Sequence, residues 1–464
     1  MPDTKRMPSA PTTPHGGGIQ VFYQGKGAIR RPTVARAEGI YMWDTDGRRY
    51  IDASSGPVVS NIGHGNKRVL AAMIEQAEKV AFASRAVFEN EPNARLADLI
   101  TGLAGPGLER AYFVSGGSEA TETAVKLARQ YAVAKGEAAR WKVIGRDPGY
   151  HGATLGAASV TGDPQAAAMF APLMPAMPKV PAPFTYRLPP NHDVDSYARA
   201  CAAALEETIR REGAETVLAF IMEPVGGLAT GALVAPDHYY RAVREICDRH
   251  GVLLIYDEVM SGAGRTGSFL AADHWPDARP DLVTLAKGIA AGYTPMGAVL
   301  APAAMVATIA ESGGFLHGHT YASNPLSCAI GHAVVSEMLA QNLMANAERM
   351  GALLRSRLEA LKATSAILGD VRGKGLLLAI EIVADKATKA ILPAERQAVY
   401  RIIELGIERG LLLYSRRTAN GKYGEWLMIT PPLIVTAAEV DEIAGLIGET
   451  LQAYEAELRS AGVI

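Results

Sequence analysis

The chain has 464 residues, of which 48% are hydrophobic and 20% charged, so it can form a sizeable core and, by length, two or three domains. Lys and Arg number 46 against 48 Asp and Glu, a balance that gives no sign of binding to nucleic acid or to a membrane surface. No apolar run reaches the roughly 20 residues that span a bilayer. The three scattered cysteines, Cys201, Cys247 and Cys328, favour free thiols in a reducing compartment such as the cytoplasm, and they predict no metal site.

The first residues are rich in Pro, Thr and Gly and contain no apolar stretch typical of a secretory signal. We therefore expect residues 1–20 to be flexible. Residues 39–54 predict a hairpin, because two alternating runs flank Asp46-Gly47, a strong turn signal. We assign residues 21–64 to the N-terminal part of a small domain.

From about residue 65 onward, helical segments alternate with short and nearly all-apolar runs. Four runs are clear, at 111–114, 217–222, 252–256 and 282–286, and a fifth candidate strand is 297–301. Apolar strands separated by helices indicate a mostly parallel sheet that is covered on both faces. We expect residues 65–328 to form this large α/β domain.

The C-terminal part has a different pattern. A long helical stretch follows residue 325, then the segment LGDVRGKGLLLAIEIV at 368–383, which we interpret as one alternating strand. Helices are expected near 394–409 and 437–458. We assign residues 329–464 to a second, smaller α+β domain.

The polar residues that follow the apolar runs carry the chemistry, because ligands bind beyond the carboxyl ends of the strands in open α/β sheets. After the first run, the glycines of SGGSEATETAVKLAR permit a tight turn with exposed amides, and Ser118 begins a helix. This arrangement predicts an anion site, although a plain capping loop is an alternative. The segment matches neither common nucleotide-binding motif.

Three other strands end in ionisable residues, namely Glu223, Asp257 and Lys287. Each alone has an ordinary explanation, as a capping acid or a surface lysine. Together with an anion cradle they form a set that fits pyridoxal phosphate chemistry. A desolvated lysine has a lowered pKa and becomes a nucleophile that forms a Schiff base, and an acid serves the pyridine nitrogen.

A series of segments resembles the successive blocks of the class III aminotransferases, which are fold-type I pyridoxal phosphate enzymes that include the ω-amino acid and amine:pyruvate transaminases. The blocks occur in family order over about residues 39–440: SGGSEATETAVKLAR, GYHGATLGA, MEPVGG, LLIYDEVMSGAGRTG, LAKGIAAGYTPMGAV and HGHTYASNPLSCA. The resemblance implies a mostly parallel seven-stranded sheet covered by helices, and a smaller α+β domain formed from the N- and C-terminal parts.

The resemblance also implies roles for individual residues. Lys287 corresponds to the lysine that holds pyridoxal 5'-phosphate as a Schiff base, and Asp257 to the acid that pairs with the pyridine nitrogen. The other implied cofactor-binding residues are Val259 and Tyr150 on the two ring faces, Gly117 and Ser118 at the phosphate, Glu223 in a supporting role, and Thr320, donated to the phosphate by a partner subunit. We leave His151 as a hydrogen-bonding loop histidine and Arg265 as an ion-pairing loop residue.

The implied reaction is a ping-pong transamination between a small-molecule amine donor and an oxo-acid acceptor in a homodimer or higher homo-oligomer with shared active sites. Some relatives that handle glutamate carry an acid shortly after the EPV segment, where this chain has Leu228. This departure favours pyruvate as the acceptor. A second departure, Thr121 in place of an asparagine, is expected to be harmless.

The acceptor carboxylate needs a cation, and guanidinium groups bind carboxylates bidentately. We select Arg417 first and Arg416 second, although a solvated basic loop is the alternative. Substrate walls are expected around Val58 and Phe88, and Arg85 either adds a carboxylate contact or faces water.

Other functions stay open at this point. The same scaffold serves 2-oxoglutarate as an acceptor in 4-aminobutyrate-like enzymes, or works as an aminomutase or decarboxylase. A nicotinamide-dependent dehydrogenase lacks support because no G-x-G-x-x-G segment is present. A binding protein without catalysis would have lost the lysine or the acid, and both are present.

Overall fold

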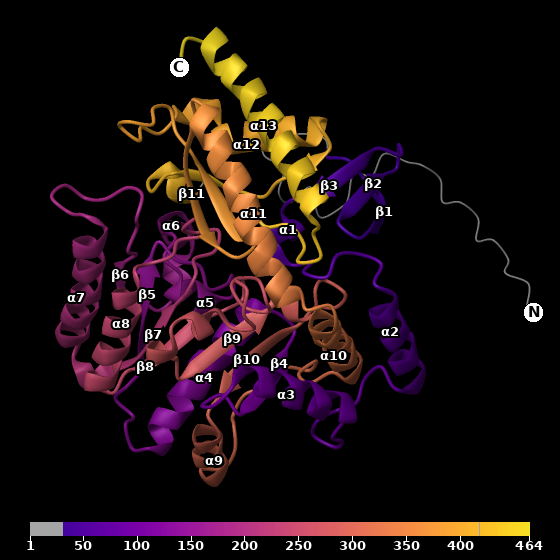
Figure 1. Cartoon of the computed structure of the whole chain (residues 1–464). Coiled ribbons are helices and arrows are strands. Elements are labelled where there is room, and N and C mark those ends of the chain that lie inside the picture. The colour runs from indigo at the N-terminus through magenta and orange to yellow at the C-terminus, as the bar shows by residue number, and fades with distance from the viewer. Residues whose placement is uncertain (1–30, 417) are drawn as a thin grey trace, which may run out of the picture.

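Three sheets form the framework of the computed structural model, which describes residues 31–416 and 418–464 (Figure 1). The segment 1–20 that we expect to be flexible, and Arg417, lie outside the described residues. In the part of the chain that is described, no helix combines the length and the apolarity needed to cross a membrane.

The largest sheet has seven strands in the order β4-β10-β9-β8-β7-β5-β6. Six of them run in the same direction, namely β4, β5, β6, β7, β8 and β9, whereas β10 is antiparallel to both of its neighbours, β9 and β4. The expected mostly parallel seven-stranded sheet is thus confirmed. Its strands are β4 (Arg110–Val114), β5 (Lys142–Asp147), β6 (Lys179–Pro181), β7 (Val217–Met222), β8 (Leu253–Asp257), β9 (Leu282–Ala286) and β10 (Gly297–Ala301).

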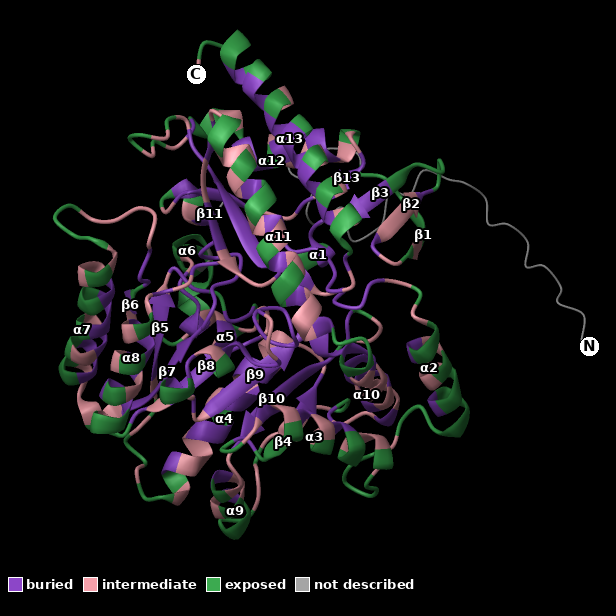
Figure 2. Ribbon diagram, viewed as in Figure 1, coloured by how far each residue is buried: buried purple, intermediate pink, exposed green. Residues whose placement is uncertain are grey.

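Helices cover both faces of this sheet, so that its central strands are buried along their whole length (Figure 2). On one face, Ile221 and Ile255 belong to a core shared with α4, and on the other, Phe220 and Leu254 pack in the main core. The helices of this part are α2 (Lys67–Lys79), α3 (Glu91–Ala104), α4 (Gly117–Ala134), α5 (Leu155–Val160), α6 (Pro164–Phe170), α7 (Val194–Glu212), α8 (Asp237–His250), α9 (Ala303–Glu311) and α10 (Pro325–Ala340).

Of the two small sheets, the four-stranded one, in the order β1-β2-β3-β13, joins the N-terminal and C-terminal parts of the chain, and the three-stranded one, β11-β12-β14, is formed by C-terminal strands alone. The expected hairpin is present as β2 and β3, and β13 from the C-terminal part pairs in parallel with β3. The elements are β1 (Val34–Glu38), β2 (Tyr41–Asp44), β3 (Arg49–Asp52), α1 (Ser55–Val58), α11 (Leu343–Thr364), β11 (Leu368–Lys374), β12 (Leu377–Ile382), α12 (Ala398–Glu408), β13 (Leu411–Leu412), β14 (Glu425–Ile429) and α13 (Ala437–Ser460). Indigo and orange-yellow segments accordingly lie together at the top of Figure 1.

Two details of the C-terminal part differ from our expectation. The segment 368–383 is not one strand but an antiparallel pair, β11 and β12, that turns at Gly375 with a φ of 55°. A side chain at Gly375 would approach the backbone of Thr266 to 2.7 Å, so only glycine fits this turn. The long helical stretch is likewise two helices, because Asn342 adopts a left-handed conformation between α10 and α11.

Short 3-10 helices complete the connections: η2 (Ala171–Leu173), η3 (Ala214–Thr216), η4 (Ala271–His274), η5 (Pro276–Ala278), η6 (Lys287–Ile289), η7 (Ala394–Arg396) and η8 (Thr418–Gly421).

Candidate active site

Lys287 lies directly after β9, at the first position of η6, and it is half-buried where it lines a cavity. Burial lowers the pKa of its ammonium group to about 8, because the charged form is poorly solvated, whereas Asp257 and Glu223 act in the opposite direction. The next residue is glycine for a steric reason, since a Cβ at Gly288 would lie 2.2 Å from the Asn61 amide nitrogen. The turn after β9 is therefore tightly packed, and it places an amine that loses its proton more readily than an exposed lysine does.

Asp257 ends β8, beside β9, and it is held by three hydrogen bonds. The His151 Nδ1–H donates to Oδ2 at 2.8 Å, and the Thr284 hydroxyl and the Val259 amide both donate to Oδ1 at 3.1 Å. Both Asp257 and His151 are buried, at 4% and 1% side-chain exposure. The carboxylate is therefore fixed in orientation.

From the sequence we expected His151 only to form hydrogen bonds within a loop, and not to orient Asp257. The histidine is itself held by two threonines, because the Thr161 hydroxyl accepts its amide hydrogen at 2.9 Å and the Thr121 hydroxyl donates to its carbonyl at 2.7 Å. Thr121, which departs from the family pattern, thus has a local partner. The one available signal was the position of His151 next to Tyr150 in the YHG segment.

Glu223 directly follows β7, at the level of Asp257. Its Oε1 accepts the Gly227 amide hydrogen at 2.9 Å, while Oε2 is buried and has no hydrogen-bond partner among the described residues. Burial is the main cause that raises the pKa of this carboxyl group above its usual value. A buried oxygen without a partner indicates a site shaped for something that is not protein.

The N-terminus of α4 faces the same space. No side chain caps this 18-residue helix, and the Ser118 hydroxyl instead accepts the Ala153 amide hydrogen at 3.0 Å. The Glu119 carboxylate accepts the Ser115 amide hydrogen at 2.8 Å, so one part of the capping alternative is present beside the uncapped first turn. A Cβ at Gly117 would come within 3.0 Å of a Val259 methyl group, so the glycine lets Val259 pack closely against the helix end. The free amides of this helix end are the kind of group that binds an anion.

A cavity of about 150 Å³ joins these groups. The structure brings together all of the proposed cofactor residues except Thr320, which is exposed in the single chain and does not line the cavity. The lining residues are Gly117, Ser118, Tyr150, His151, Gly152, Glu223, Asp257, Val259, Met260 and Lys287. A buried amine, an oriented carboxylate and an anion cradle can hold a phosphorylated pyridine aldehyde.

Comparison with known proteins agrees with this geometry. The family model of the class-III aminotransferases matches residues 24–451. The chain is a class III aminotransferase.

Several relatives of the aminotransferase are similar over almost the whole chain. An uncharacterized aminotransferase, YodT, from Bacillus subtilis is 38% identical over 92% of this chain and 96% of its own length. A diaminobutyrate–2-oxoglutarate transaminase from Halomonas elongata is 34% identical over 88% of both chains. A putrescine–pyruvate aminotransferase from Pseudomonas aeruginosa is 31% identical over 89% of both chains.

Among solved structures, an ω-transaminase from Pseudomonas jessenii in complex with PMP matches with a TM-score of 0.86 and 30% identity, over 93% of this chain and 94% of the other. The cofactor of the aminotransferase is pyridoxal 5'-phosphate, which class III aminotransferases use. The cavity fits this cofactor. Among the described residues, His151 Nε2 and Glu223 Oε2 are buried without a hydrogen-bond partner, and the first turn of α4 has no side-chain cap. These are the kinds of groups that a bound polar ligand would engage.

The substrate residues selected from the sequence are scattered in the single chain of the aminotransferase. Arg416 lies next to the cavity, with its guanidinium carbon 5.2 Å from the centre of the Tyr150 ring and an ion pair of 3.0 Å to Asp163. Val58 is buried outside the cavity, and Phe88 is 63% exposed. Arg85 donates to the carbonyl of His317 at 3.3 Å.

Arg265 of the aminotransferase differs from our expectation. It is fully buried and forms no ion pair with a described residue; instead it donates to the carbonyls of Leu376 and Pro431 and to the side chains of Ser55 and Asn61. Burial lowers the pKa of this guanidinium to about 9. The residue therefore ties the N-terminal segment to the C-terminal part.

Proposed function

We propose that this aminotransferase moves an amino group from an ω-amino acid or aliphatic amine to pyruvate by a ping-pong mechanism. The observation that carries the choice of acceptor is Leu228, a buried apolar residue at the position where an acid would serve a glutamate-type site. Its carbonyl accepts the Trp426 indole N–H at 2.7 Å, which fixes the loop with the leucine inside the core.

The proposed role of Lys287 is to bind the cofactor and then to move a proton. When bound, pyridoxal phosphate supplies an electron sink for the pair released from the donor C–H bond. The Lys287 amine suits the role of base at this bond, since its lowered pKa of about 8 gives a substantial neutral fraction near neutral pH.

Asp257 is proposed to face the pyridine nitrogen. A carboxylate that accepts from His151, Thr284 and the Val259 amide cannot rotate freely, so its charge stays aimed at one point. His151 supports this orientation as a positioning residue, and Glu223 has a supporting position beside the ring.

The remaining cofactor contacts are proposed from their positions around the cavity. Gly117 and Ser118 would hold the phosphate at the start of α4, and Val259 and Tyr150 would enclose the ring from its two faces. Thr320 would complete the phosphate contacts from a second subunit, in agreement with its exposure in the single chain.

The positions of Arg416 and Leu228 support a monocarboxylate acceptor. Pyruvate presents one carboxylate, whereas 2-oxoglutarate presents two and needs a second cation or a polar equivalent. Within residues 31–416 and 418–464, Arg416 is the guanidinium that lies over Tyr150. Leu228 has no carboxylate that could form an ion pair with a second substrate-binding arginine. One relative named above is a 2-oxoglutarate transaminase and another a pyruvate aminotransferase, so family membership leaves this choice to the chain's own residues.

A donor-by-acceptor panel tests the proposal. Putrescine, β-alanine and 1-phenylethylamine would be supplied as donors with pyruvate or 2-oxoglutarate, and the rate of amino transfer measured for each pair. We expect activity with pyruvate and at least tenfold less with 2-oxoglutarate, the size of effect produced by one unpaired buried charge. Activity with 2-oxoglutarate alone would show that the inference from Leu228 is wrong.

A further inference from the structure

A second and larger hollow lies at the outer edge of the seven-stranded sheet. Its volume is about 510 Å³, against about 150 Å³ for the cavity at Lys287, and the two share no lining residue. Its walls are the edge strand β6, the connection from β6 to α7 that arches outward at the left of Figure 1, and the loop before β14. Pockets of roughly 300–1,000 Å³ are the usual size for small-molecule sites.

Aromatic side chains form much of its wall. The rings of Phe184 and Tyr423 stack with centroids 5.6 Å apart and planes inclined by 16°, and Tyr197 lies beside them. Because aromatic faces pack favourably against other flat rings, this wall suits a planar ligand.

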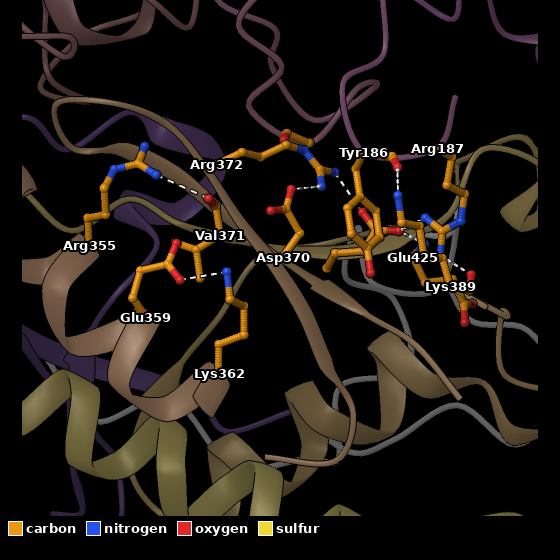
Figure 3. A network of polar contacts seen from close by, with 12 residues as sticks. Tyr186, Arg187, Arg355, Glu359, Lys362, Asp370, Val371, Arg372, Lys389 and Glu425 are labelled. Carbon is orange, nitrogen blue, oxygen red and sulfur yellow. Dashed lines mark hydrogen bonds and ion pairs between the residues drawn. The ribbon is translucent and has the colours of Figure 1, made fainter. Parts of the chain in front are cut away.

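The charges of the hollow favour an anion. Lys179 and Lys422 line it and form no ion pair with a described residue, whereas its one carboxylate, Asp147, already accepts the Tyr423 hydroxyl hydrogen at 3.1 Å. Arg187 also lines the hollow but is occupied by Glu381 and by the carbonyl of Lys389, and Figure 3 shows Arg187 and Lys389 grouped beside Tyr186. The Lys179 Nζ donates to the carbonyls of Ser159 and Met177 at 2.7 and 3.0 Å, which leaves one of its three N–H groups. Lys422 and this remaining N–H of Lys179 are thus available for a negative ligand group.

The hollow shares its two flanking segments with the active site. Asp147 ends β5 three residues before Tyr150, and Tyr423 belongs to the loop that also carries Arg416. The Tyr423–Asp147 hydrogen bond joins these segments at the hollow, and the contact of Arg416 with the Tyr150 ring joins them again at the active site. A ligand that moves Tyr423 therefore acts on the loop of Arg416.

We propose that this hollow is an effector site for a planar aromatic carboxylate, and that Tyr423 transmits its occupancy to the active site. The ring of the ligand extends the stack on Phe184, and its carboxylate pairs with Lys422 and Lys179.

Calorimetric titration of the holoenzyme with 2-naphthoate tests the binding step. Lys422→Gln and Phe184→Ala should each weaken binding about tenfold, as expected for the loss of one charge-assisted contact or one aromatic contact. Naphthalene-2-carboxamide, which lacks the charge, and cyclohexanecarboxylate, which lacks the flat ring, should bind at least tenfold more weakly. Arg416→Leu is the matched control for adventitious binding in the active site, and it should leave the affinity unchanged.

The transmission step has a separate readout, the visible circular dichroism of the bound cofactor, which needs no substrate and is independent of the acceptor that the enzyme uses. The probe should change this band in the wild type. Tyr423→Phe keeps the ring but loses the hydrogen bond to Asp147. The affinity of this variant for the probe should lie within twofold of the wild-type value, but addition of the probe should not change its circular dichroism band. Absence of binding, equal binding of the carboxamide, loss of binding in Arg416→Leu, or an unaltered response in Tyr423→Phe would each overturn the proposal.

Discussion

At the end of β9, Lys287 adopts a backbone φ of 49°, in the left-handed region that residues other than glycine rarely occupy. The packing of Gly288 against Asn61 and the buried strand before it hold the turn in place. With this conformation, Lys287 lines the same cavity as Asp257 and Glu223. A strained residue at this point agrees with a role in catalysis rather than in folding.

The lowered pKa of Lys287 leads to a measurable pH dependence. In the apoprotein, only the neutral amine adds to the aldehyde of pyridoxal phosphate, so the rate of adduct formation should rise with pH and level off above about 8. Below this value it should fall about tenfold per pH unit. Borohydride trapping at a series of pH values measures the rate, with Lys287→Ala as the control. A midpoint near 10, typical of an exposed lysine, would contradict the expected desolvation.

His151 provides a second test at a single residue. His151→Phe removes the donor to Asp257 Oδ2 and should lower kcat by roughly tenfold or more, since an unpaired buried acceptor costs about 1–3 kcal/mol. His151→Asn places an amide donor close to the position of Nδ1 and should recover part of the loss. Steady-state kinetics of both variants, with the cofactor saturating, gives the comparison. Equal impairment of the two variants would mean that His151 acts through packing and not through Asp257.

The residues at strand ends were predictable from the sequence because the chain leaves little freedom there. Parallel strands deliver their carboxyl ends to one edge, so Glu223, Asp257 and Lys287 had to lie close together once the strands were recognised. His151 and Asp163 belong to loops, and their positions depend on tertiary contacts that no local pattern encodes. The roles assigned to Val58 and Phe88 stay predictions, since neither lines the cavity in a single chain.

At the level of elements, the buried strands were the best predicted. The bounds of β7 and β9 coincide with the apolar runs, because both strands are buried on both faces. The strands β5 and β6 begin with lysine and lie toward the edge of the sheet, so they produced no continuous apolar run. The β11–β12 turn was missed because its glycine responds to the neighbouring backbone of Thr266, which is remote in the sequence.

A cluster of charges fastens these C-terminal strands to the rest of the molecule. Glu381 on β12 is 1% exposed at its side chain and lies between Arg187 and Arg372. Arg372 also pairs with Asp370, as Figure 3 shows, and donates to the carbonyl of Gly231 in the loop after Glu223. The cluster thus connects the three-stranded sheet of β11, β12 and β14 with the loop that contains Leu228.

Glu381→Gln tests how much this cluster contributes to stability. The substitution leaves Arg372 buried with only part of its compensation, so the free energy of unfolding should fall by about 3 kcal/mol. Urea denaturation with saturating cofactor measures it. Glu457→Gln is the matched control, because its ion pair with Arg401 is exposed and should change stability by less than about 1 kcal/mol. Similar losses in both variants would contradict a special role for the buried cluster.

At the scale of the whole molecule, two neighbouring segments expose several large apolar side chains together. The segments 81–90 and 315–324 lie side by side, joined by the Asn324 amide at the carbonyl of Ala81 and by the Asn90 amide at the carbonyl of Ser323. They expose large apolar residues: Phe82, Val87, Phe88, Leu316 and Tyr321. Thr320 lies within this patch, which supports the proposal that a second subunit covers it and receives the threonine.

Mixed dimers of Lys287→Ala and Thr320→Ala, two variants that each lack one residue of the proposed site, test whether the site is shared between subunits. If Thr320 serves the partner's cavity, a dimer of Lys287→Ala with Thr320→Ala contains one site that has both native residues and one site that has neither. Co-refolding or co-expression at equal amounts should therefore restore about a quarter of the wild-type activity, since half of the dimers are mixed and each carries one intact site of two.

The alternative arrangement gives a different result with the same proteins. If Thr320 acted within its own chain, no mixed dimer would hold an intact site, and the activity would not exceed that of Thr320→Ala alone. A mixture of Lys287→Ala with Asp257→Asn is the matched control, because both residues line the same chain's cavity. That control should stay inactive whichever subunit receives Thr320, so a rise in the first mixture and none in the second is the signature of a site built from two chains.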